Sequence, residues 1–273
     1  MPCELAIIIV SYNAAADLQR CLRSLHDAPP VIPHEIIVVD NASTDGSPAI
    51  ARRWPDVRLI EAGGNLGFAR ANNLGVRESA SELILLLNSD TLVPPGAIDR
   101  LVADLEAHPE AAIAGPRIVD GEGRTELSFG RMMGPLNELR QKLLVQLHAR
   151  GIWPVATLVE QRTRRAGAPD WVSGACLLVR RADAEAAGLL DEGYFLYAED
   201  VDFCAAVRAH GRTVRFVPDA QIVHLRGRSG ASAPRATERA YRESQLRFYE
   251  KHHPRWAPWL RGYLRVRGKL PRG

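Results

Sequence analysis

The stretch Leu83-Ile84-Leu85-Leu86-Leu87-Asn88-Ser89-Asp90 is the most informative in this 273-residue chain. Five consecutive apolar residues are typical of a strand buried in a parallel sheet. In open α/β folds, ligands bind just beyond the carboxyl ends of such strands. A carboxylate at that point suits a divalent cation that carries a diphosphate, because hard metals bind one or two carboxylates together with phosphate oxygens. Asp is also an ordinary turn residue, so the assignment of Asp90 to a metal site depends on the other motifs in the chain.

Strands and helices alternate through about the first 115 residues. This alternation predicts right-handed βαβ units and a parallel sheet. The pattern loosens after Pro116. Strands are predicted at 5–11, 35–40, 57–61, 83–88, 171–181, 213–217 and 221–224, and helices at 17–25, 69–79, 96–108, 133–147, 199–210 and from 235 onward.

The charge is unevenly distributed along the chain. The net charge is +3, but residues 131–165 carry +5 and residues 251–273 carry +7, which leaves about −9 for the rest. An acidic body with two basic segments indicates anionic partners at particular places rather than general nucleic-acid binding. The hydrophobic fraction of 46% is ordinary for a globular protein.

Cysteine spacing and hydropathy exclude several classes of protein. Cys3, Cys21, Cys176 and Cys204 are scattered without a CxxC pair, which excludes a zinc ribbon and gives no indication of a disulfide framework. The first residues lack the pattern of a signal peptide. No stretch approaches the roughly 18 apolar residues of a membrane span. The expected location is therefore the cytoplasm.

Five motifs occur in order, and together they carry a family resemblance. They are Val10-Ser11-Tyr12-Asn13, Val38-Val39-Asp40-Asn41-Ala42-Ser43-Thr44-Asp45-Gly46-Ser47, Gly64-Asn65-Leu66-Gly67-Phe68-Ala69, Asn88-Ser89-Asp90 and Ala198-Glu199-Asp200-Val201-Asp202. In order and spacing, about residues 5–230 resemble a family-2 glycosyltransferase. Within that family the chain is most similar to bacterial rhamnosyltransferases and galactofuranosyltransferases of cell-wall and O-antigen synthesis. The resemblance implies a GT-A, Rossmann-like α/β fold with a mostly parallel central sheet. We expect a catalytic domain at 1–230 and a basic helical extension at 231–273.

The resemblance places the nucleotide of a sugar donor at the first strand ends. Tyr12 would lie against the base, and Asp40 would accept a hydrogen bond from the imide N–H of uracil or thymine. Without the motif, Tyr12 would equally fit a half-buried aromatic residue at a strand end. Asp40 alone would slightly favour a turn-forming Asp. Asn65 and Gly67 begin a helix whose free N–H groups would face phosphate. The full expected nucleotide-binding set is Ser11, Tyr12, Asn13, Asp40, Asn65, Gly67, Asn88, Ser89, Arg226 and Arg228.

The resemblance also implies a divalent metal, Mg or Mn, bound to Asp90. Relatives often have Asp-x-Asp here, whereas this chain has Asn88, which offers a carbonyl oxygen but no charge. Several relatives use a His from the C-terminal part as a further ligand, and His224 falls where that ligand would lie. A lone His after an apolar segment is otherwise often structural.

The acidic motif Glu199-Asp200-Val201-Asp202 crowds three carboxylates into four positions at a predicted helix start. Acidic residues in a first turn stabilise a helix by about 0.3–1 kcal/mol each, but their mutual repulsion also raises a pKa towards the range of a general base. The resemblance places the base in this motif, at Asp200. Glu199 or Asp202 would orient the acceptor or bind a loop. The segment lining the acceptor and sugar is matched by Trp171, Ser173 and Gly174.

These expectations describe an inverting, metal-dependent sugar transfer. A nucleotide-diphosphate donor, with dTDP-rhamnose favoured, would react with a hydroxyl of a lipid-linked glycan or a polysaccharide. A UDP-sugar such as UDP-galactofuranose is the alternative within the family. A sugar-phosphate nucleotidyltransferase is disfavoured, because Ser11-Tyr12-Asn13 replaces its Gly-rich phosphate loop. Because Asn88 supplies no charge, a second alternative is a family relative that binds nucleotide or carbohydrate without catalysing transfer.

Two predicted helices combine apolar and basic residues. One face carries Leu136, Leu139, Leu143 and Leu147, and another carries Trp259, Leu260, Tyr263 and Leu264. Each helix fits peripheral contact with the inner face of an anionic cytoplasmic membrane, and equally fits packing on the domain with a solvated basic side. If the acceptor is lipid-linked, membrane contact is the favoured interpretation of these two helices. Oligomeric state is left open by the sequence.

Overall fold

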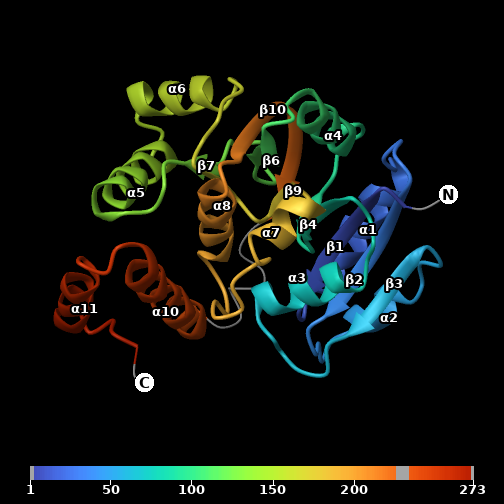
Figure 1. Cartoon of the computed structure of the whole chain (residues 1–273), viewed down its shortest axis with the longest axis horizontal. Helices are drawn as coiled ribbons and strands as arrows, with labels where there is room; N and C mark the ends of the chain where they lie inside the picture. Colours follow the sequence, from blue (N-terminus) through green and yellow to red (C-terminus); the bar gives the residue numbers. More distant parts are fainter. Residues whose placement is uncertain (1–2, 226–233, 272–273) are drawn as a thin grey trace.

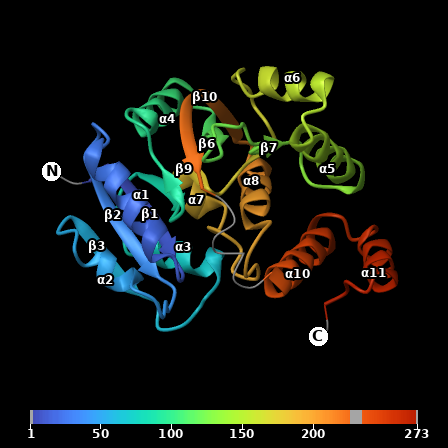
Figure 2. The ribbon, with the colours of Figure 1, turned by 180° about the vertical axis from the view of Figure 1, so that it is seen from behind.

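The computed structural model describes residues 3–225 and 234–271, and within them it contains one mixed eight-stranded sheet (Figures 1 and 2). The strand order is β3-β2-β1-β4-β9-β6-β10-β5. The first four of these strands run parallel, as do β6 and β10, whereas β9 and β5 are antiparallel to their neighbours. The expected mostly parallel α/β sheet is confirmed. Its strands are β1 (Leu5–Ser11), β2 (His34–Asp40), β3 (Val57–Glu61), β4 (Leu83–Asn88), β5 (Thr91–Leu92), β6 (Ala111–Val119), β9 (Cys176–Arg180) and β10 (Thr213–His224).

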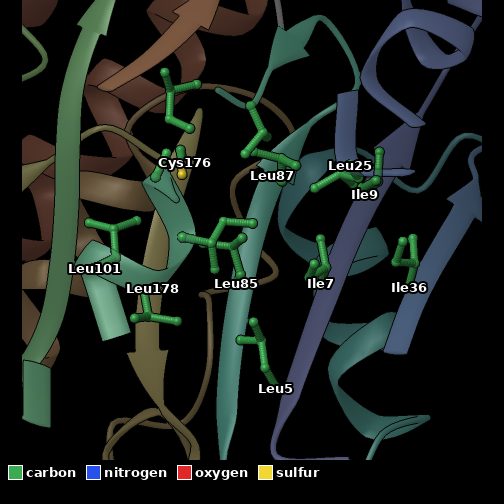
Figure 3. Packing of buried hydrophobic residues seen from close by; sticks show 14 of the residues in the cluster. Leu5, Ile7, Ile9, Leu25, Ile36, Leu85, Leu87, Leu101, Cys176 and Leu178 are labelled. Atoms are coloured by element: carbon green, nitrogen blue, oxygen red, sulfur yellow. The ribbon is translucent and has the colours of Figure 1, made fainter. Parts of the chain in front are cut away.

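The central strands are apolar at successive positions because helices cover both faces of the sheet. Side chains of one strand alternate between two cores: Ile7 packs in the first and Ile8 in the second. Figure 3 shows the first core, in which Ile7, Leu85 and Leu178 come from neighbouring strands. The uninterrupted apolar runs therefore reflect burial on both sides, as their sequence predicts.

Helices from both halves of the chain complete these two layers. The first core is covered by α1 (Ala15–Asp27), α2 (Ser47–Ala51) and α4 (Ala97–Ala107). The second is covered by α3 (Phe68–Arg77), α7 (Arg181–Ala186) and α8 (Glu199–Ala209). Gly75 allows α3 to lie close to β1, because a Cβ at this position would stand 2.6 Å from Ile8 Cγ2.

Two predicted strands differ from the structure in instructive ways. The strand expected at 171–181 is divided into β8 (Trp171–Val172), which pairs with β7 (Phe129–Gly130), and β9. The three residues between them form the turn at the site described below. The two strands expected at 213–217 and 221–224 are one strand, β10, with an irregular register between Val217 and Gln221. Pro218 lies in this irregularity, where its missing N–H costs no ladder hydrogen bond.

Four helices gather at the end of the molecule opposite β3 (Figures 1 and 2). They are α5 (Pro135–Ala149), α6 (Trp153–Arg162), α10 (Pro234–His252) and α11 (Ala257–Val266). The buried side chains of Phe248 and Ala257 join Tyr194 and Val201 in a third apolar cluster, so α10 and α11 pack on the loop that precedes α8. The predicted domain boundary at residue 230 lies outside the described residues.

No helix in the described part of the chain is both long and apolar enough to cross a bilayer. All four cysteines are free thiols, and only Cys3 is exposed. Burial raises the pKa of the Cys21 thiol to about 12, so this thiol is protonated and unreactive at neutral pH.

Candidate active site

The carboxyl ends of β1, β2 and β4 meet at one edge of the sheet. The strand register sets Ser11 beside Asp40, and Val10 beside Asn88. Each strand end presents a buried atom that has no hydrogen-bond partner among the described residues: Ser11 Oγ, Asp40 Oδ1 and Asn88 Oδ1. Buried polar atoms are nearly always satisfied, so three such atoms at one edge indicate a place for a polar ligand. Tyr12 stands beside them with 45% of its surface exposed.

The two loops after β1 and β2 are tied to each other. Asn13 Oδ1 accepts the N–H of Thr44 over 2.7 Å, and the Asn13 N–H donates to Ser43 Oγ over 2.9 Å. Asp40 Oδ2 accepts the Ser43 N–H over 2.9 Å, which is the turn geometry that its residue type predicts. Asn13 therefore holds the loops in place, while one oxygen of Asp40 is left for a ligand.

The polar groups of the glycine-rich loop at residues 63–67 form hydrogen bonds within the protein. Asn65 Oδ1 accepts the N–H of Gly67 over 3.1 Å and receives the Asn41 side-chain amide over 3.1 Å. The Phe68 N–H donates to the Phe195 carbonyl over 2.7 Å, and a Cβ on Gly67 would lie 2.5 Å from that oxygen. The N–H groups of Gly67 and Phe68 are therefore bonded within the protein, and a contact of this helix start with phosphate stays a prediction. Local sequence does not reveal the acceptor, because it comes from a residue more than 120 positions away.

Asp90 and His224 meet, as the sequence predicts. Antiparallel pairing of β5 with β10 sets His224 opposite Thr91, and His224 Nε2 lies 3.1 Å from Asp90 Oδ1. Glu126 Oε2 lies 3.7 Å from the other ring nitrogen. Burial opposes protonation of the ring, but the hydrogen bonds to Asp90 and Glu126 outweigh it and raise the pKa of His224 to about 9. The two carboxylates thus make this corner strongly attractive to a cation.

The pair of Asp90 and His224 fits a divalent metal. Two ligands at about 2.1 Å from a cation and at right angles to each other are about 3.0 Å apart, close to the spacing of these two atoms. No group of three His, Cys, Asp or Glu residues that could hold a metal occurs within 3–225 and 234–271. The protein therefore offers a partial ligand set of the kind that a metal arriving with a diphosphate completes.

Asp200 is fixed at the start of α8. Ala198 precedes the helix in a left-handed conformation, with φ of 65°. Asp200 Oδ2 accepts the Gly174 N–H over 2.8 Å, and Oδ1 accepts the Val201 N–H over 2.8 Å. A Cβ on Gly174 would lie only 3.1 Å from Asp200 Cβ. Glycine at 174 thus allows the backbone N–H to reach the carboxylate.

Burial perturbs both carboxyl groups at the start of α8. Burial and the neighbouring Asp200 charge raise the pKa of Glu199 to about 8. Burial also raises the pKa of Asp200, against the opposing effect of its hydrogen bonds from Gly174 and Val201. Glu199 Oε2 has no hydrogen-bond partner in the described structure. Two neighbouring carboxyls that both have raised pKa values are typical of sites that accept protons near neutral pH.

A single backbone segment joins Asp200 to the end of β4. Gly174 binds Asp200, and the adjacent Ala175 carbonyl accepts the N–H of Asn88 over 3.0 Å. Ser173 donates its N–H to the Ser128 carbonyl, and the Trp171 indole donates to the Arg131 carbonyl over 2.9 Å. The structure thereby brings the predicted acceptor segment, the predicted base and the strand that leads to Asp90 into one site.

Asp202 has a different environment from Asp200. It is buried, and its carboxylate accepts hydrogen bonds from Lys251 over 2.8 Å and Tyr194 over 3.2 Å, with His252 Nε2 at 2.6 Å. Of the two roles predicted for Glu199 or Asp202, Asp202 has contacts of the loop-binding kind: it binds Tyr194, in the loop before α8, together with two residues of α10. Lys251 and His252 were missed because nothing in a helix near the C-terminus points to an acidic motif about 50 residues earlier. Arg226 and Arg228 lie outside the described residues.

The chain is similar in sequence to known glycosyltransferases. The model of "Glycosyl transferase family 2" matches residues 6–184. The chain is 32% identical to an N-acetylglucosaminyl-diphospho-decaprenol L-rhamnosyltransferase of Mycobacterium tuberculosis, over 97% of this chain and 92% of that protein. It is 28% identical to a low-salt glycan biosynthesis hexosyltransferase of Haloferax volcanii, over 75% of this chain and 62% of that protein.

Solved structures share the fold. A mannosyltransferase of Pyrobaculum calidifontis, determined with GDP-Man and Mn²⁺, superposes with a TM-score of 0.63 at 20% identity, covering 95% of this chain and 68% of that one. S. aureus TarS with UDP-GlcNAc gives a TM-score of 0.61 at 16% identity, over 90% and 66% of the two chains. The architecture is therefore GT-A, and the family match covers the carboxyl ends of β1, β2 and β4 and the turn at residues 173–175. The chain belongs to glycosyl transferase family 2.

Proposed function

We propose that this enzyme transfers a sugar, with L-rhamnose favoured, from a nucleotide-diphosphate donor to a hydroxyl of a lipid-linked diphosphate glycan. The observation that carries the proposal is the bridge from Asp200 through Gly174 and Ala175 to Asn88. It sets a carboxylate with a raised pKa beside the strand edge where the unsatisfied polar atoms lie. The rhamnosyltransferase relative supports the choice of sugar and acceptor, because the similarity extends over nearly the whole of both chains.

The nucleoside would occupy the ends of β1 and β2. Asp40 Oδ1 is available to accept the imide N–H of thymine or uracil, and Tyr12 is exposed enough to lie against the base. Ser11 Oγ and Asn88 Oδ1 are the other free polar groups at this edge, and the buried Ser89 follows. We favour dTDP as the nucleotide, with UDP as the alternative that the same hydrogen bond accepts.

Asp90 and His224 would hold the divalent metal, Mg or Mn, and Asn88 would add a neutral oxygen. When bound, the metal supplies positive charge for the departing diphosphate. The presence of Mn²⁺ in the mannosyltransferase structure supports this assignment. The protein's own role here is to keep the two ligand atoms 3.1 Å apart, one just before β5 and one at the end of β10, before any donor arrives.

The reaction would be a direct displacement with inversion. The Asp200 carboxylate accepts the proton of the acceptor hydroxyl while that oxygen bonds to the anomeric carbon, and the bond from this carbon to the phosphate oxygen breaks. The products are the glycoside, the nucleoside diphosphate and protonated Asp200. The raised pKa makes Asp200 a stronger base than an ordinary carboxylate. The hydrogen bonds from Gly174 and Val201 fix its direction.

A lipid-linked acceptor resides in a bilayer, so we further propose peripheral contact with the inner face of the cytoplasmic membrane. The catalytic part corresponds to residues 1–230, with 231–273 as an extension that supports α8. We divide the chain there because all the proposed site residues precede residue 230. The helix α10, in the extension, supports the site indirectly through the hydrogen bond from Lys251 to Asp202.

A thermal-shift panel tests the donor assignment. Unfolding temperature is measured with UDP, dTDP, GDP and CDP, each with and without Mn²⁺. A nucleotide at about 100 times its Kd adds about 2.7 kcal/mol of stability, so binding is readily detected. Mn²⁺-dependent stabilisation by dTDP, followed by transfer from dTDP-rhamnose to a synthetic GlcNAc-diphosphate lipid, supports the proposal. A stronger response to UDP would indicate a UDP-sugar as the donor. The absence of a response to any of the four nucleotides would contradict the proposed function.

A further inference from the structure

Exposed apolar side chains concentrate on three helices at one end of the molecule. Of fifteen large apolar or aromatic side chains exposed in the described part of the chain, eleven lie on or beside α5, α6 and α11. All three lie at the end of the molecule away from β3 in both views, α5 and α6 next to each other and α11 beside α10 (Figures 1 and 2). The eleven are Leu136, Leu139, Leu143, Val145, Ile152, Trp153, Leu158, Trp256, Trp259, Tyr263 and Val266. We call them the apolar end.

On α11 the apolar end forms a continuous stripe. Trp256, Trp259, Tyr263 and Val266 are spaced three or four residues apart, so they lie along one side of the helix. Trp259 is 75% exposed, whereas Leu264 is fully buried on the opposite side. The predicted single face of Trp259, Leu260, Tyr263 and Leu264 is therefore divided: the two leucines pack inward and the two aromatic residues point to solvent. The helix is apolar on both sides.

On α5 the usual arrangement of an amphipathic helix is reversed. Its inward contact is polar: Glu138 Oε2 accepts the Tyr249 hydroxyl over 2.8 Å, and Glu138 Oε1 accepts hydrogen bonds from Gln245 and Lys142. No residue of α5 is fully buried, and Leu136 and Leu139 are exposed. The helix is thus anchored to α10 through a carboxylate while its leucines face outward, which is unfavourable in water.

Positive charge surrounds the apolar end. Within the described residues, Arg131, Arg140 and Arg162 form no ion pair, and the Arg162 guanidinium stacks 5.3 Å from the centre of the Phe129 ring. Burial and the nearby charges of Arg140 and Arg131 lower the pKa of Arg162, so these three cations crowd one another. Residues 251–273 add seven Lys and Arg side chains and no acidic residue, of which Lys251, Arg261 and Lys269 pair with acidic side chains earlier in the chain. Crowded guanidinium groups favour an anionic partner.

We propose that the apolar end docks on an anionic phospholipid bilayer, with the leucines and aromatic residues entering the interface and the arginines contacting lipid phosphates. Aromatic residues on one side and basic residues around them are the composition of an interfacial surface. A second copy of the chain fits less well, because two such surfaces of the same positive charge repel each other. The inference deepens the proposed function and rests on it only for the location of the acceptor.

Flotation with vesicles tests the proposal without acceptor or nucleotide. The full chain is mixed at low salt with phosphatidylcholine vesicles, with or without phosphatidylglycerol. We expect it to float with the phosphatidylglycerol vesicles and to be released by high salt, because exposed charges are screened. The double variants Trp259→Ser/Tyr263→Ser and Leu139→Ser/Leu143→Ser should each lose about tenfold in partitioning, or about 1.4 kcal/mol. All four positions are exposed, so the fold should be retained, as circular dichroism can check.

Matched controls decide between this surface and general stickiness. Val31 is 89% exposed between α1 and β2, and Val31→Ser should float like the wild type. Arg140→Gln/Arg265→Gln should weaken flotation, whereas Arg23→Gln/Arg53→Gln, an equal loss of charge on α1 and after α2, should not. Failure of the wild type to float, equal losses in the controls, or a dimer that the Trp259→Ser/Tyr263→Ser variant dissociates without changing flotation would overturn the proposal. Because no nucleotide is present, each result is independent of the donor assignment.

Discussion

Lys251 Nζ donates a hydrogen bond to Asp202 Oδ2 over 2.8 Å and thereby joins the last turn of α10 to the first turn of α8. Asp202 lies two residues after Asp200 on the same helix. The Asp202 carboxylate is buried, with 2% of its side chain exposed, whereas Lys251 is 42% exposed. α10 thus holds the helix that carries the proposed base.

Replacing Lys251 by methionine should loosen this junction. We expect a loss of about 1–2 kcal/mol in the free energy of unfolding, because Lys251 loses its charged hydrogen bonds to the buried Asp202 and to Asp191, while His252 and Tyr194 remain as partners of Asp202. Urea denaturation measures the change. Lys269→Met is the matched control, since its partner Glu238 is exposed. Equal destabilisation by the two substitutions would show that the Asp202 contact has no special importance.

Gly174→Ala should reduce turnover while nucleotide binding persists. The added Cβ would lie 3.1 Å from Asp200 Cβ, so the carboxylate must move away from the backbone N–H that orients it. We expect kcat to fall at least about tenfold, since small displacements of a catalytic group carry large rate costs. Gly167→Ala meets no atom within 4 Å and should be neutral. A fully active Gly174→Ala enzyme would contradict the orienting role.

The pH dependence of stability should report the buried carboxyls. The pKa of Glu199 rises from an ordinary value to about 8 in the folded protein, so between about pH 4.5 and 8 the folded state binds more protons than the unfolded state. Stability must then fall as pH rises through this window, by up to about 1.4 kcal/mol per pH unit for one group. Glu199→Gln should flatten the decline, as urea titrations at several pH values can show. If stability falls with pH as steeply in the variant as in the wild type, a group other than Glu199 is responsible for the decline.

Loss of the metal-side pair should abolish the effect of Mn²⁺. In His224→Ala, we expect the Mn²⁺-dependent part of nucleotide stabilisation to disappear, because only the Asp90 carboxylate and the weak neutral oxygen of Asn88 are left to bind the cation. His210→Ala removes an exposed imidazole after α8 and should leave the response unchanged. Isothermal titration with Mn²⁺ and the preferred nucleotide measures both variants. Retention of Mn²⁺ dependence in His224→Ala would remove His224 from the ligand set.

The sequence predicted the sheet edge well because the relevant rule is local. Apolar runs define β1, β3 and β4 with the residue bounds that the structure shows, and parallel strands bring Asp40 and Asn88 to one edge. The meeting of Asp90 and His224 followed from family resemblance, and antiparallel pairing of β5 with β10 accounts for it physically.

Other features depend on tertiary partners that local patterns do not specify. The Gly67 loop is organised by Phe195 and Asn41, and Asp202 by α10. The spacing of leucines on α5 defines a face correctly but does not say whether that face packs inward. Glu138 decides the orientation, because it binds Tyr249 from a helix about 110 residues later.

The central claim is that Asp200 is the base, and Asp200→Asn tests it most directly. The variant keeps a side chain of the same shape, and its carbonyl oxygen can still accept the Gly174 N–H. Dissociation constants for the nucleotide with Mn²⁺ are measured beside the rate of sugar transfer. We predict wild-type nucleotide affinity with a loss of transfer of at least about a hundredfold, the contribution typical of a general base. Transfer at the wild-type rate with Asn at position 200 would contradict the account.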